Sequence, residues 1–117
     1  MSTAPIIDPV AIEALKSINP EDGGEFLREI IQIFLEDTPA RIAELDEALG
    51  SGDVAKFVRA AHSIKGSSSN VGAMLLQATA ERLEHSAKDQ GIQPMVPLIQ
   101  RLKDEYALTA DKLKEIN

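Results

Sequence analysis

Helical periodicity runs through most of this sequence and restricts the chain to an all-α fold. Apolar residues recur at spacings of three, four or seven, so each segment can bury one face of a helix. No segment alternates in the pattern of a half-buried strand, and no Asn-Gly or Asp-Gly hairpin joins two such segments. The pattern therefore predicts a protein built from helices alone.

Breaks rich in glycine, proline and asparagine divide the chain into five predicted helices. They lie at 19–24, 50–53, 70–72 and 91–94. The first helix is short, from about 9 to 17, because Asp8 provides an N-cap and Pro9 suits the first helical position. Four longer helices follow, at about 24–49, 54–69, 72–88 and 94–115.

Short connections determine how these helices pack. Pro39 removes one hydrogen bond inside the segment 24–49, and we expect a single kinked helix there. Helices joined by short loops run antiparallel to their neighbours. The sequence therefore predicts one domain over residues 1–117, an up-down-up-down four-helix bundle whose short first helix closes one end.

Composition and charge exclude several classes of protein. A net charge of −7 and a pI near 4.7 disfavour a nucleic-acid binder and a protein that binds an anionic membrane. The absence of cysteine excludes disulfides, thiol catalysis and zinc sites that need cysteine. No apolar run approaches the roughly 20 residues of a membrane helix, and the start does not resemble a secretory signal. We expect a cytoplasmic protein.

One predicted helix carries an unusual set of side chains around His62. If the apolar stripe of the segment 54–69 faces the core, His62 lies beside it and projects toward solvent. Its neighbours one or two turns on are Lys65, Gly66 and Ser69. A neutral imidazole is a competent nucleophile near pH 7, and a nearby ammonium favours a phosphoryl group on the ring.

Gly66 lies inside a predicted helix, where glycine lowers helix stability by about 1 kcal/mol relative to alanine. The absent Cβ would let a partner surface approach the histidine. Close packing between two helices of the bundle is the other explanation of this glycine. Together these features indicate a surface histidine prepared to hold phosphate and to meet another protein.

The pattern His-x-Ile-Lys-Gly-Ser-Ser-x-x-Val-Gly-Ala, from His62 to Ala73, resembles the signature of histidine-containing phosphotransfer (HPt) domains. The resemblance extends over nearly the whole chain, including residues 7–9, 34–37, 48–53 and 83–84. One mild departure is Ile64, where many members have leucine.

The resemblance implies a phosphorelay intermediate. Such a domain takes phosphate from a receiver-domain aspartate onto histidine Nε2 and gives it to another receiver. His62 would carry the phosphate, and Lys65 would stabilise its charge. Gly66 would give the partner access, and Ser69 is a secondary candidate for hydrogen bonding. The chain would need no cofactor and no ATP site, since the receiver supplies magnesium. The partners would be response-regulator receiver domains, including those of hybrid histidine kinases.

The second ring nitrogen of His62 needs an acceptor that fixes its tautomer. In related chemotaxis-type domains a carboxylate on the next helix has this role, and Glu84 occupies the matching position. Counting along the helices from a turn near residue 71 instead places residue 80 level with His62, so Glu81 is the alternative. His85, near a predicted helix C-terminus, is expected to have only a structural role.

Three other functions are consistent with a helical bundle. A helical adaptor would bind receivers without carrying phosphate. A di-metal carboxylate bundle needs Glu-x-x-His motifs, and neither histidine ends one. The dimerisation domain of a sensor kinase would have an acidic residue after its histidine, whereas Ser63 follows His62. We expect a monomer, free-standing or part of a larger kinase, which docks its partner around His62 with Val58 and Ile12 nearby.

Overall fold

The computed structural model describes residues 6–18 and 21–116, which form five α-helices and one short 3₁₀ helix. The elements are α1 (Pro9–Ile18), α2 (Glu25–Ser51), α3 (Val54–Asn70), α4 (Met74–Gln90), η1 (Gln93–Met95) and α5 (Val96–Ile116). The all-α prediction is confirmed, and each helix ends within two residues of its predicted position. The predicted break at Asn19 and Pro20 lies outside the described residues. No helix in the described ranges is long and apolar enough to cross a membrane.

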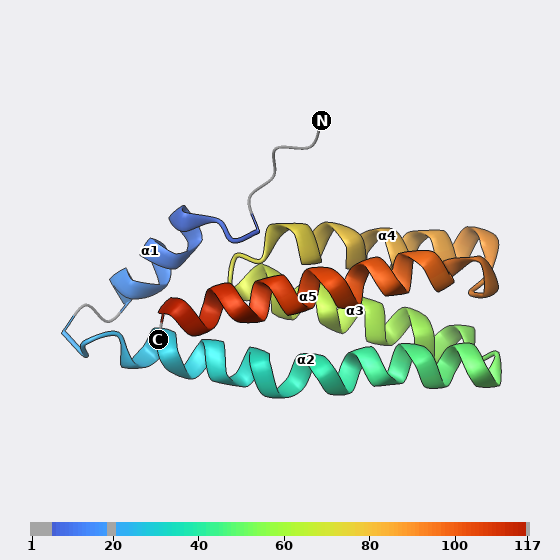
Figure 1. Ribbon diagram of the computed structural model, residues 1–117, viewed down its shortest axis with the longest axis horizontal. Helices are drawn as coiled ribbons and strands as arrows, with labels where there is room; N and C mark the ends of the chain where they lie inside the picture. The colour runs from blue at the N-terminus through green and yellow to red at the C-terminus, as the bar shows by residue number, and fades with distance from the viewer. Residues whose placement is uncertain (1–5, 19–20, 117) are drawn as a thin grey trace.

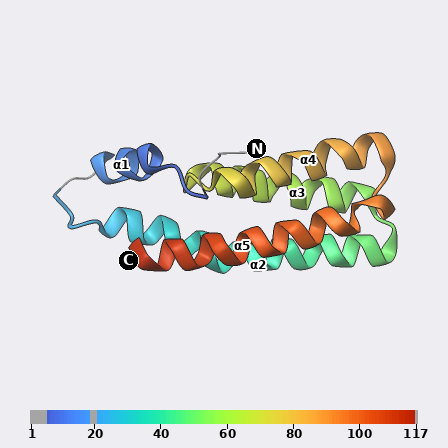
Figure 2. The ribbon, with the colours of Figure 1, turned by 45° about the horizontal axis from the view of Figure 1, so that its top comes forward.

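The four long helices form a closed ring around one core. α2 packs against α3 and α5, and α4 packs against the same two helices from the other side. Successive helices run in opposite directions (Figure 1). α1 packs against α2 and lies at the end of the bundle where α2 begins and α5 ends (Figure 2). The predicted antiparallel four-helix bundle with a short additional helix is confirmed.

The core is a single cluster made almost entirely of aliphatic side chains. Its large, fully buried members are Ile31, Leu45, Phe57, Ile64, Val71, Leu76, Leu83, Leu102 and Leu113. The stripe Leu98, Leu102, Tyr106, Thr109 and Leu113 was expected to be the buried face of α5, but Leu98 and Tyr106 are only half-buried, while Ile99 and Glu105 are buried. The reason is that α5 packs against both α2 and α4, so it buries more than one stripe.

Local capping explains where the helices begin and end. Asp8 and Asp53 each accept a hydrogen bond of 3.0 Å from a backbone N–H in the first turn of the helix that follows. Gly52 has a φ of 72° and forms the left-handed cap of α2, whereas Gly50 stays helical. These caps confirm the breaks expected from the sequence.

Gly72 joins α1 to the loop between α3 and α4. Its carbonyl accepts a 2.7 Å hydrogen bond from the backbone N–H of Asp8, and a Cβ at Gly72 would lie 2.7 Å from the Cβ of Ala11. The φ of Gly72 is 70°, a left-handed value that a helix cannot contain. α4 therefore begins at Met74 rather than at the predicted position 72.

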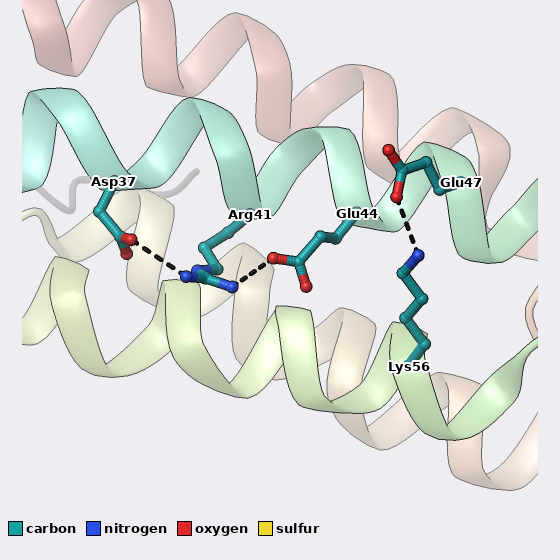
Figure 3. A network of polar contacts seen from close by, with 5 residues as sticks. All are labelled: Asp37, Arg41, Glu44, Glu47 and Lys56. Atoms are coloured by element: carbon teal, nitrogen blue, oxygen red, sulfur yellow. Dashed lines mark hydrogen bonds and ion pairs between the residues drawn. The ribbon is translucent and has the colours of Figure 1, made fainter.

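Four charged side chains of α2 and one of α3 form polar contacts where these two helices meet (Figure 3). Arg41 contacts Asp37 and Glu44 on its own helix, and Lys56 Nζ reaches across from α3 to Glu47 Oε2 at 2.8 Å. All five side chains are at least 30% exposed, so each pair contributes little to stability.

α2 continues through Pro39 without a break in the helix. Proline has no N–H, so the carbonyl of Leu35, four residues earlier, lacks its usual helical donor. The hydroxyl of Tyr106 on α5 donates a 3.3 Å hydrogen bond to that carbonyl. A contact between two helices therefore replaces the bond that the proline removes.

This replacement predicts a coupling between Tyr106 and Pro39. Tyr106→Phe should lower the free energy of unfolding by about 1 kcal/mol, because the Leu35 carbonyl loses its donor. In a Pro39→Ala background the alanine N–H supplies that donor, so Tyr106→Phe should cost clearly less. Denaturant unfolding of the two single variants and the double variant measures the difference. Equal losses in both backgrounds would contradict this account.

Candidate functional site

His62 lies on the outer surface of α3, on the side that faces α4. Its helical neighbours Ala61 and Ile64 are completely buried and hold this part of α3 against the core. The side chain of His62 is 65% exposed. The imidazole therefore stands out from the bundle on a firmly packed helix.

A carboxylate from α4 holds the inner edge of the ring. His62 Nδ1 lies 3.0 Å from Oε2 of Glu84, whose side chain is only 8% exposed. Glu81 instead faces solvent and lies 3.9 Å from His85 on its own helix. Of the two candidates left open by the sequence, Glu84 is the residue that contacts the ring.

Counting residues misplaced Glu84 for two physical reasons. The loop between α3 and α4 is centred on Gly72, which puts Arg82 rather than residue 80 level with His62. In addition, helical side chains lean toward the N-terminus of their helix. In antiparallel helices this lean brings the His62 ring and the Glu84 carboxylate toward each other.

Lys65 holds the other oxygen of the same carboxylate. Its Nζ lies 2.9 Å from Glu84 Oε1, and its side chain is only 25% exposed. Burial by itself would raise the pKa of Glu84, but the hydrogen bonds from Lys65 and His62 outweigh it and the pKa lies below its ordinary value. The hydrogen bond to Glu84 likewise raises the pKa of Lys65. The pair is therefore fully charged at neutral pH.

An ionised Glu84 determines which ring nitrogen of His62 is free. A carboxylate only accepts hydrogen bonds, so Nδ1 must donate and carries the proton of the neutral ring. Nε2 then keeps its lone pair. Among the residues that the structure describes, Nε2 has no hydrogen-bond or ion-pair partner. In the neutral ring, Nε2 is therefore the nitrogen without a proton.

Gly66 lies one turn after His62, and the space around it is open. A Cβ built at this position would meet no atom within 4 Å in the described chain. Close packing between helices therefore does not explain the glycine. Ser69, one turn further on, is exposed.

One contact of the site was missed by the sequence analysis. Lys88 Nζ lies 3.7 Å from Glu84 Oε2, so a second lysine shares the carboxylate. The spacing of four residues between Glu84 and Lys88 places them on one helical face and was available as a signal.

The surroundings of the ring differ in part from the predicted docking surface. Val58 is half-buried, but Ile12 is buried in the core and cannot offer an exposed apolar contact. Ile12 turns inward because α1 lies against the bundle with that face. Within residues 6–18 and 21–116, no group of three or more His, Cys, Asp or Glu side chains could hold a metal ion.

Comparison with known families identifies the same part of the chain. The family model described as Hpt domain matches residues 29–112, a range that contains the whole site. Histidine-containing phosphotransfer protein 2 of Arabidopsis thaliana is 26% identical over 105 residues, which cover 87% of this chain and 67% of that protein. Multistep phosphorelay regulator 1 of Schizosaccharomyces pombe is 29% identical over 80 residues, 68% of this chain but 27% of the regulator.

Solved structures share the fold. Histidine-containing phosphotransfer protein B from Pseudomonas aeruginosa PAO1 superposes with a TM-score of 0.86 at 31% identity, covering 97% of this chain and 95% of that one. A maize histidine-containing phosphotransfer protein gives a TM-score of 0.84 at 23% identity, covering 98% of this chain and 85% of that one. The second likeness supports the fold alone.

The lowered pKa of Glu84 predicts how the site contributes to stability as pH changes. The ionised carboxylate stabilises the fold above about pH 4.5, its ordinary pKa, and this contribution is lost as pH falls through the lower folded value. Glu84→Gln should therefore be less stable than the original protein at pH 7, and the difference should shrink below about pH 4.5. The free energy of unfolding of both proteins, measured from pH 7 to below about pH 4.5, tests this prediction. Glu29→Gln, at an exposed position, is the control. A difference that does not vary with pH would contradict the assignment.

Proposed function

Since the chain belongs to the Hpt domain family, we propose that it is a phosphorelay intermediate and that His62 is the residue that carries the phosphoryl group. The observation that supports this most is the orientation of the ring. Glu84 Oε2 lies 3.0 Å from Nδ1, so Nε2 is the nitrogen without a proton in the neutral ring, and the side chain is 65% exposed. A nucleophile is thus presented outward on a rigid helix, where another protein can reach it.

The proposed transfer uses only groups that this arrangement provides. The lone pair of Nε2 attacks the phosphorus of a receiver aspartyl phosphate. As the N–P bond forms, the P–O bond to the aspartate breaks and its electrons remain on the receiver carboxylate. The proton on Nδ1 stays on the ring, and the positive charge that develops there is stabilised by Glu84. The reverse sequence passes the phosphoryl group to a second receiver.

The partners in this proposal are response-regulator receiver domains. The names of two relatives, a histidine-containing phosphotransfer protein and a multistep phosphorelay regulator, support such a role. We further propose that the chain acts as a monomer in the cytoplasm and that a hybrid histidine kinase can supply one receiver. The chain would work without an ATP site or cofactor of its own, and magnesium would belong to the receiver.

The proposal makes His62 indispensable. His62→Gln should abolish acid-labile, alkali-stable phosphate on the protein after incubation with a phosphorylated receiver, because the proposed transfer places the phosphoryl group on Nε2 of this histidine. His85→Gln is the matched control, since His85 is equally exposed, on α4, and should leave labelling unchanged. Circular dichroism checks that both variants keep the bundle. Labelling that persists without His62 would instead leave a helical adaptor as the better description.

Substitution of Gly66 should stabilise the fold but slow phosphotransfer. Gly66→Ala should raise the free energy of unfolding by about 1 kcal/mol, because the helix interior favours alanine and the added Cβ meets nothing in the chain. The same Cβ should slow phosphotransfer from a receiver, and a bulkier Gly66→Leu should slow it further.

Gly50 provides the control for this experiment. It is also helical, an added Cβ there would have no atom within 4 Å, and it lies on another helix, next to the C-terminus of α2. Gly50→Ala should therefore leave the transfer rate unchanged. If Gly66→Ala transfers as fast as Gly50→Ala, the glycine does not serve partner access.

A further inference from the structure

Glu84 is shared by three basic side chains, and they hold it unequally. Lys65 lies 2.9 Å from Oε1, and the ring of His62 lies 3.0 Å from Oε2. Lys88 lies 3.7 Å from Oε2, beyond ordinary hydrogen-bond length, and its side chain is 54% exposed. Lys88 therefore has room to move closer to the carboxylate.

A phosphoryl group on Nε2 would compete with Glu84 for the ammonium group of Lys65. The group brings negative charge and strong acceptor oxygens to the surface where Lys65 lies one turn after His62. As Lys65 turns toward those oxygens, its contact with Glu84 weakens. A carboxylate that is only 8% exposed is then left with less positive charge beside it, which is unfavourable.

Lys88 is the residue placed to replace that contact. It follows Glu84 by one helical turn, so the two side chains lie on the same face of α4. Of the other two basic residues on this helix, His85 lies next to Glu81, and Arg82 lines a pocket with Pro94 and Leu98. Closing the present 3.7 Å gap would give Glu84 a direct hydrogen bond from a second ammonium.

We propose that Lys88 is a positioning residue that takes over the pairing of Glu84 when Lys65 turns to the phosphoryl group on His62. The carboxylate then stays ionised and keeps its hold on Nδ1 throughout the transfer. This inference rests on the proposed function, since it needs His62 to carry the phosphoryl group.

The equilibrium constant for transfer between a receiver and this protein tests whether Lys88 replaces Lys65 as the partner of Glu84, a change that we call the exchange. With dilute proteins this constant compares free species, so a residue that only assists docking changes the rate and leaves the equilibrium unchanged. Lys88→Met should lower the phosphorylated fraction of this protein, reducing the constant by about threefold. Lys88→Arg should restore it. Lys114→Met, the same loss of charge at an exposed position on α5, is the control.

The double variant distinguishes exchange from general attraction of phosphate by Lys88. In a Lys65→Met background, Lys88 pairs with Glu84 both before and after transfer. Lys88→Met should then destabilise the two states equally and should no longer change the equilibrium constant. A direct attraction between Lys88 and the phosphoryl group would give the same loss in both backgrounds, and that result would overturn the proposal.

Two further outcomes are informative. If Lys88→Met matches Lys114→Met while His62 still takes phosphate, the exchange fails and the phosphocarrier role stands. If His62→Gln still takes phosphate, the proposed function itself fails. Thermal unfolding of each variant accompanies these measurements, and Lys88→Gln is a second neutral replacement.

Discussion

The buried carboxylate of Glu84 is the group on which the rest of the site depends. It ties α4 to α3 through Lys65 and His62, and it fixes the tautomer of a ring that is otherwise in solvent. Burial of an acidic side chain is unfavourable, and the two contacts outweigh that effect enough to lower its pKa. The same interaction therefore joins two helices and, in the proposed function, leaves Nε2 as the nitrogen that would take the phosphoryl group.

The bundle supports this arrangement by holding its helices rigidly. Ala61 and Ile64 anchor the histidine helix in the core, and the bond from Tyr106 to the carbonyl of Leu35 compensates for the proline inside α2. Gly66 weakens α3 four residues after His62 without relieving any contact within the described chain. This loss of helix stability next to His62 is consistent with the proposal that another protein approaches the ring there.

The sequence predicted most features that depend on neighbouring residues, the contact of Lys88 with Glu84 excepted, and missed those that depend on distant ones. Helix ends were predictable because Asp8, Asp53 and Gly52 act within one turn. The partner of His62 was left open because helix tilt and side-chain lean cannot be counted along a chain. The link from Tyr106 to Leu35 spans 71 residues and had no local signal. Ile12 was expected on the surface because nothing local shows which face of α1 meets the bundle.

The position of phosphorus on the ring is the most direct measure of the central claim. Protein labelled with ¹⁵N-histidine and phosphorylated by a receiver would be examined by NMR correlation of ring nitrogens with protons and phosphorus. The account predicts one phosphohistidine, His62, with phosphorus on Nε2 and a proton on Nδ1. Phosphorus on Nδ1 of His62, or on His85, would contradict it.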